Sequence, residues 1–154
     1  MKSAQQWFSE YAVSHQNTTN EYIHWICVPA IFWSILGLFS LWEIPFLTFE
    51  TSIPLFNSGL VFLSAFGLLF YATLCLRVFL GMFLYLSINV YLISCWNGTF
   101  ANPLYHYILI FVLAWIGQFI GHKIEGKKPS FLKDLQFLMI GPAWVLNQWF
   151  SRKK

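Results

Sequence analysis

Charged residues are scarce in this chain, and their scarcity excludes an ordinary soluble domain. Lys, Arg, Asp and Glu make up 10% of the 154 residues, whereas about 25% is typical of soluble domains. Hydrophobic residues make up 58% and fall into several separate apolar runs. The first ten residues hold no such run, so we expect no cleaved signal peptide. The composition predicts a small polytopic membrane protein with uncleaved spans.

Cysteine is also sparse, and a disulfide framework is not expected. Cys27, Cys75 and Cys95 are an odd number, form no CxxC pair and lie within apolar runs. Isolated thiols of this kind usually pack as small hydrophobic groups, although Cys27 lies one turn after His24 and stays a conceivable metal ligand. The basic excess is small, with a net charge of +3. Membrane topology accounts for it, so no nucleic-acid partner is expected.

Four apolar runs predict membrane-spanning helices, since about 20 helical residues cross the hydrocarbon core. They cover about residues 22–42, 59–76, 82–96 and 104–122. Pro29 lies inside the first run, where membrane helices tolerate it, and is expected to kink the helix. Arg77 and Gly81 mark the expected turn between the second and third runs. Residues 97–103 read as a loop, with Pro103 opening the fourth helix.

Two further segments are expected at the membrane surface. Aromatic residues and His15 recur at helical spacing near the start of the chain, which predicts a short amphipathic helix. Asn20 is expected to cap the first span, with Glu21 in its first turn. Residues 135–150 are apolar but short and are interrupted by a Gly-Pro pair, so they predict an interfacial or re-entrant helix. The predicted fold is all-α, as a single membrane domain.

Basic residues are distributed unevenly between the two predicted membrane faces. The face that holds the N-terminus carries Lys2, Arg77, Lys123, Lys127, Lys128 and Lys133. The opposite face carries Glu43 and Glu50 and no Lys or Arg. The positive-inside rule therefore makes the first face cytoplasmic.

This topology sorts the four histidines. His15, His24 and His122 fall at the cytoplasmic edge, and His106 starts the fourth span at the other face. The sixteen residues from His106 to His122 rise by about 24 Å along a continuous helix. One metal ion therefore cannot bind both, and His106 is left out of the candidate site.

The three cytoplasmic histidines suggest a metal centre. Ionisable groups next to lipid are costly and usually mark function, and imidazole suits iron, zinc and copper. The polar break at residues 16–20 allows the rings of His15 and His24 to converge. The alternative is that these side chains only form hydrogen bonds with helix ends and lipid headgroups.

Polar residues accompany these histidines at helical spacing. Asn20 lies four residues before His24, and Gln118, His122 and Glu125 follow one another on one helix face. Glu125 is either a further ligand or an acceptor that orients a ligating imidazole. Tyr11, one turn before His15, suits the same two roles.

Residues 11–34 and 115–146 resemble the signature blocks of the 2-hydroxy fatty acid dioxygenases of fatty-acid alpha-oxidation, an integral membrane family. The shared pattern is a His, then Asn and His one turn apart, then Pro, and later Gln-Phe-Ile-Gly-His followed by Glu and Pro. Here these residues are His15, Asn20, His24, Pro29, Gln118 to His122, Glu125 and Pro129. The intervening chain resembles the family only in its hydrophobic character.

The resemblance implies an Fe(II)-dependent dioxygenase. It would use O2 to shorten a 2-hydroxy long-chain fatty acid by one carbon. In this chain His15, His24 and His122 would bind Fe(2+), and Asn20, Gln118 and Glu125 would support them. The substrate carboxylate would be attracted by Lys123, Lys127 and Lys128, although each alone is better explained as a topology anchor. The acyl tail would run into lipid between the first and fourth spans.

Two other functions stay open from the sequence, namely a b-type cytochrome with His24 and His122 as ligands and a non-catalytic lipid-binding membrane protein. Four histidines are too few for a membrane di-iron hydroxylase or desaturase. The expected location is the bacterial inner membrane or the endoplasmic reticulum, with the site on the cytoplasmic side.

Overall fold

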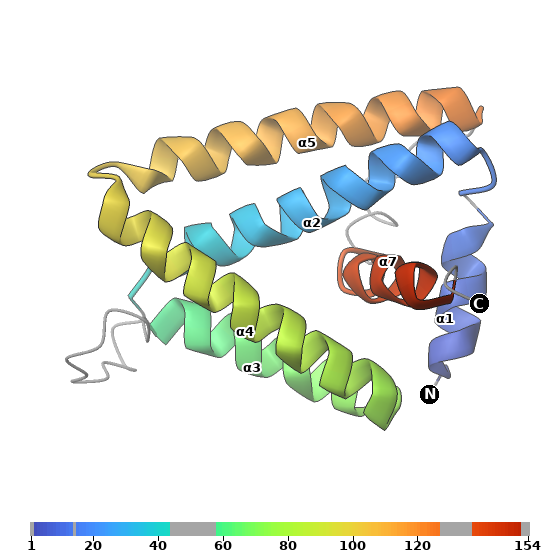
Figure 1. Cartoon of the computed structure of the whole chain (residues 1–154), viewed down its shortest axis with the longest axis horizontal. Helices are drawn as coiled ribbons and strands as arrows, with labels where there is room; N and C mark the ends of the chain where they lie inside the picture. Colours follow the sequence, from blue (N-terminus) through green and yellow to red (C-terminus); the bar gives the residue numbers. More distant parts are fainter. Residues whose placement is uncertain (1, 14, 44–57, 127–136, 152–154) are drawn as a thin grey trace. The chain divides into compact units, whose positions relative to one another are not determined.

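A computed structural model describes residues 2–13, 15–43, 58–126 and 137–151, and its only regular structure over these ranges is α-helix. The helices are α1 (Ala4–Ala12), α2 (Thr18–Ser40), α3 (Ser58–Ala72), α4 (Leu76–Thr99), α5 (Pro103–Glu125) and α7 (Ile140–Ser151) (Figure 1). The predicted all-α class is confirmed. Lys127, Lys128, Pro129 and Lys133, which the sequence analysis singled out, lie outside the described residues.

Three of the described helices are long and apolar enough to cross a membrane. They are α2, α4 and α5, with 23, 24 and 23 residues, and each contains an 18-residue stretch with a mean hydropathy of 1.7, 1.9 and 1.7, respectively. Large apolar side chains such as Leu80 and Leu84 on α4 and Leu113 on α5 are exposed, as lipid-facing residues of a span would be. The helix α3, which matches the predicted second span, is apolar but has only 15 residues. The helices indicate membrane association, and the four-span count stays a prediction.

The helix boundaries correct two predicted loops. The turn between α3 and α4 lies at residues 73–75, where Cys75 is extended with φ −171°, and Arg77 and Gly81 are inside α4. A lone glycine costs a helix only about 1 kcal/mol, so Gly81 does not end it. The predicted loop at 97–103 is shorter, because α4 continues to Thr99. The fourth predicted helix does begin at Pro103.

The N-terminal region also differs in detail from the prediction. The helix α1 starts with a capping box between Ser3 and Gln6 and ends at Ala12, so His15 lies in the link to α2 and outside the helix. The side chain of Asn17 accepts hydrogen bonds from the backbone N–H groups of residues 19 and 20 at the start of α2. Asn17 therefore takes the capping position that the sequence analysis gave to Asn20, and Asn20 is left for another role.

The described chain divides into two compact units. The first contains residues 1–32 and 112–154, and in it α1 packs against α7. The second contains residues 33–111, and in it α3 packs along α4. The candidate functional residues described below belong to the first unit.

Candidate metal centre

Three buried imidazoles converge in the first unit. His15 comes from the link before α2, His24 from the second turn of α2, and His122 from the end of α5. Their ring nitrogens include one from each residue, all within 4.8 Å of one another. The exposed fractions are 8%, 1% and 4%. We call these three residues the histidine cluster, and its members are the ones that the sequence analysis grouped.

Backbone carbonyls orient two of the three rings. Nδ1 of His24 lies 2.9 Å from the Asn20 carbonyl oxygen, and Nδ1 of His15 lies 2.7 Å from the Tyr11 carbonyl oxygen. A carbonyl oxygen can only accept, so each Nδ1 carries the hydrogen and each Nε2 is left with a lone pair. Ligating histidines are commonly held in this way by an acceptor on the second nitrogen. In the described part of the chain, Nε2 of His24 is buried without a hydrogen-bond partner. The donor set therefore fits a metal ion.

The carboxylate of Glu125 ties the His15 segment to the end of α5. It accepts hydrogen bonds from the backbone N–H of Gln16 and of Asn17, each at 2.9 Å, and from Asn20 Nδ2 at 3.0 Å. Asn20 is fully buried, and its carbonyl oxygen holds His24. Glu125 and Asn20 thus form one chain of contacts that runs from α5 to two of the histidines.

Two glycines allow α5 to approach α2 closely beside the histidine cluster. A Cβ at Gly121 would collide with Asn20 Oδ1 and lie 3.2 Å from His24 Cε1, and a Cβ at Gly117 would collide with Sγ of Cys27. A pair of small residues four apart is a common packing device of membrane helices. The sequence carries this signal as Gly117-x-x-x-Gly121, and the sequence analysis missed it.

Aromatic rings from α1 and α7 enclose His15. The Tyr11 ring stacks on it, with centroids 4.1 Å apart and planes 10° apart, and the Trp144 ring lies tilted beside it, with centroids 5.5 Å apart. Tyr11 also contacts Trp144, at 5.0 Å, and Phe137, at 5.4 Å. Sequence spacing singled out Tyr11 but gave no signal for Trp144 or Phe137, because they approach from a distant part of the chain.

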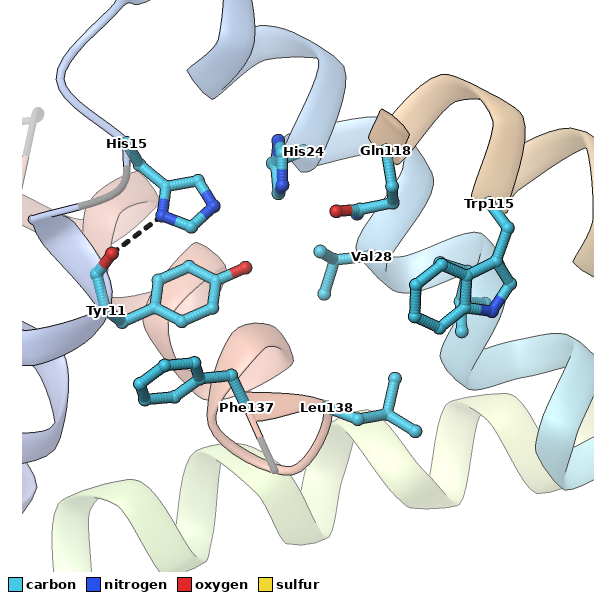
Figure 2. A pocket seen from close by; sticks show the side chains of 9 residues that line it. Tyr11, His15, His24, Val28, Trp115, Gln118, Phe137 and Leu138 are labelled. Atoms are coloured by element: carbon cyan, nitrogen blue, oxygen red, sulfur yellow. Dashed lines mark hydrogen bonds between the residues drawn. The ribbon is translucent and has the colours of Figure 1, made fainter. Parts of the chain in front are cut away.

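A pocket opens beside the histidine cluster (Figure 2). Its polar lining consists of Tyr11, His15, His24 and Gln118, and its apolar lining of Val28, Ile31, Trp115, Phe137 and Leu138. The cavity has a volume of about 20 Å³. The pocket thus combines a small polar end with apolar walls from α2 and α5.

Comparison with protein families matches residues 1–153 to the family described as 2-hydroxy-palmitic acid dioxygenase Mpo1-like. The chain belongs to this family. The resemblance drawn from two sequence blocks is thereby confirmed, and the family match extends over the apolar middle of the chain as well. No curated protein and no solved structure was found to match.

The remaining candidate residues of this family member lie outside the histidine cluster. Lys123 is exposed near the end of α5, away from the described pocket lining. His106 belongs to the second unit, where its ring lies edge-on against Trp96 and Phe100. The helix α5 runs unbroken from Pro103 to Glu125, so His106 and His122 are at its opposite ends. Cys27 is a free thiol that packs against Gly117.

Proposed function

We propose that this protein is an Fe(II)-dependent dioxygenase that shortens 2-hydroxy long-chain fatty acids by one carbon. The observation that carries the proposal is the convergence of three buried imidazoles, from three separate chain segments, beside a pocket with apolar walls. The family description supports the substrate class, since it names a 2-hydroxy-palmitic acid dioxygenase.

His15, His24 and His122 would hold the ferrous ion. Three neutral nitrogen ligands leave coordination positions open, and iron with open positions can take both O2 and a chelating substrate. A 2-hydroxy acid suits such a site because its hydroxyl and carboxylate are neighbours. Glu125 and Asn20 would act on the ligands, since their hydrogen bonds fix the His15 segment and the His24 ring.

The overall reaction balances without an external reductant when the lost carbon leaves as CO2. One 2-hydroxy acid and one O2 then give the acid one carbon shorter, CO2 and water. The C1–C2 bond breaks, both carbons are oxidised, and O2 takes up the four electrons. The apolar walls of the pocket and the buried position of the rings would keep bulk water away from the reacting carbons.

A single-turnover experiment tests the proposal. The purified protein is loaded with Fe(II) without air, mixed with 2-hydroxypalmitate and then with O2, and the acids are analysed by mass spectrometry. We expect up to one C15 acid for each 2-hydroxypalmitate added. Iron binding without formation of C15 acid would contradict the proposed substrate. A Soret band in the purified protein would favour a cytochrome.

A further inference from the structure

The pocket beside the histidine cluster is lined by one buried amide whose N–H donors have no partner among the described residues. Gln118 is 6% exposed and lines the pocket from α5. Within the described residues, its Nε2 atom is buried and has no hydrogen-bond partner. A buried donor without a partner is costly, and native structures rarely keep one without a reason.

The surroundings of this amide define what it can bind. Figure 2 shows the Gln118 side chain directed toward the part of the pocket that holds His15 and His24. The same pocket is also lined by the apolar side chains of Val28, Ile31, Trp115 and Leu138. A ligand that fills this space needs a hydrogen-bond acceptor at the end near Gln118 and an apolar chain behind it.

The size of the pocket favours the end of a chain over its middle. The cavity has a volume of about 20 Å³, which is enough for roughly one water-sized polar group. Most of the residues that line the pocket are apolar. A carboxylate attached to methylene groups matches this combination of a small space and apolar walls.

We infer that Gln118 donates a hydrogen bond from Nε2 to the carboxylate of a long-chain 2-hydroxy acid, whose first methylenes lie against Val28, Ile31, Trp115 and Leu138. The inference rests on the proposed function and assigns the recognition of the carboxylate to Gln118, where the sequence analysis had given it to lysines. Lys123 is exposed and does not line the described pocket. Gln118 is thus a substrate-positioning residue on α5.

The test compares two ligands that differ only at C1, where one carries a carboxylate and the other a hydroxyl group. The protein, loaded with Fe(II) and kept free of air in phosphatidylcholine nanodiscs, is titrated with 2-hydroxypalmitate and with hexadecane-1,2-diol. Empty nanodiscs correct for partition into lipid. The variants are Gln118→Leu and the isosteric Gln118→Glu, and Gln5→Leu, an exposed position on α1, is the matched control. Iron content is measured for each variant.

We expect Gln118→Leu to raise the Kd of the acid by about tenfold to a hundredfold, the usual range for a hydrogen bond to a charged group. The Kd of the diol should change by less than about threefold, since no charged acceptor is lost, and the iron content should stay at the wild-type level. Gln118→Glu should raise the Kd of the acid at least as much, because the carboxylates of the variant side chain and of the ligand would face each other. Gln5→Leu should bind both ligands as the wild type does.

Three results would overturn the inference. These are an unchanged Kd of the acid in both Gln118 variants, an equal weakening of acid and diol, or loss of iron from both variants. If the wild type forms C15 acid while one of these results is obtained, the proposed function stands and only the role of Gln118 fails. If the wild type neither binds nor converts 2-hydroxypalmitate, both proposals fail together.

Discussion

Each of the two units contains a cluster of polar side chains. The clusters differ in whether their polar groups are closed, that is, paired with one another by hydrogen bonds. In the unit formed by residues 33–111, Tyr107 donates to Asn97 Oδ1 at 2.7 Å, and Asn97 Nδ2 donates to Ser40 Oγ at 2.9 Å. Ser40 in turn donates to the Gly37 carbonyl oxygen at 2.6 Å. We call this the Ser40 network, and its groups satisfy one another.

The histidine cluster is built in the opposite way. Backbone carbonyl oxygens hold Nδ1 of His15 and of His24, and the three histidines bring one ring nitrogen each to within 4.8 Å of one another. Gln118 adds a buried N–H group that the described residues do not satisfy. A closed network stabilises the fold, whereas an open one is completed by something that the chain does not supply. We therefore expect the Ser40 network to contribute mainly to stability, and ligand binding at the histidine cluster stays the proposal that the following predictions test.

The largest effect is expected from removing a histidine of the cluster. His24→Ala or His122→Ala should abolish stoichiometric iron binding and C15 acid formation, because two imidazoles alone are a weak site for Fe(II). His106→Ala is the matched control, since His106 lies in the other unit against Trp96 and Phe100. Iron analysis measures metal binding, and the single-turnover reaction measures C15 acid formation, in each variant. Iron retained in His24→Ala and His122→Ala would mean that the cluster is structural.

A smaller but still large effect is expected at Gly121. Gly121→Ala would place a Cβ against Asn20 Oδ1 and push α5 away from His24. Overpacking of this kind costs about 1–3 kcal/mol, and displaced metal supports lower affinity by about tenfold to a hundredfold. Gly81→Ala is the control, because a Cβ there has nothing within 4 Å. Iron affinity and thermal unfolding in detergent distinguish the two variants, and equal behaviour would contradict the close packing.

Glu125 offers a way to disturb the histidine cluster without touching a ring. Glu125→Gln replaces one acceptor oxygen by a donor that faces the backbone N–H groups of Gln16 and Asn17. The His15 segment should loosen, and iron affinity should fall by about tenfold. Glu10→Gln, at the exposed ion pair with Lys2, should leave iron affinity unchanged. If Glu125→Gln keeps full affinity, the carboxylate does not position His15.

How much of this site the sequence could predict depends on where each contact comes from. Asn20 and His24, or His122 and Glu125, share a helix face by spacing alone, so their grouping follows from the helical period. The contact between the rings of Trp144 and His15 depends on how α7 packs against α1, which no local pattern specifies. The prediction that Asn20 caps the first span was wrong for a local reason. Asn17 is an equally good helix cap, and the side chain of Asn20 instead donates a hydrogen bond to Glu125.

The closed cluster should respond in stability alone. Tyr107→Phe removes the donor to Asn97 Oδ1 and should lower the free energy of unfolding by about 1 kcal/mol, as is typical of hydrogen bonds between membrane helices. Iron content and C15 acid formation should not change. Tyr105→Phe, at an exposed side chain, is the control for the lost hydroxyl. Loss of iron in Tyr107→Phe would show that the Ser40 network also supports the metal centre.

The smallest effect is expected at Lys123, and its size bears on how the pocket recognises a carboxylate. Lys123 is exposed, so its attraction for an anion is screened by salt within about 10 Å. Lys123→Met should raise the KM for 2-hydroxypalmitate by less than about threefold, and added salt should erase the difference. A larger, salt-resistant rise would move carboxylate recognition from the buried amide of Gln118 to the membrane surface. In that case the Nε2 donor of Gln118 would need a partner other than the substrate carboxylate. Gln118 would then no longer be evidence that the pocket beside the histidine cluster is completed by a ligand.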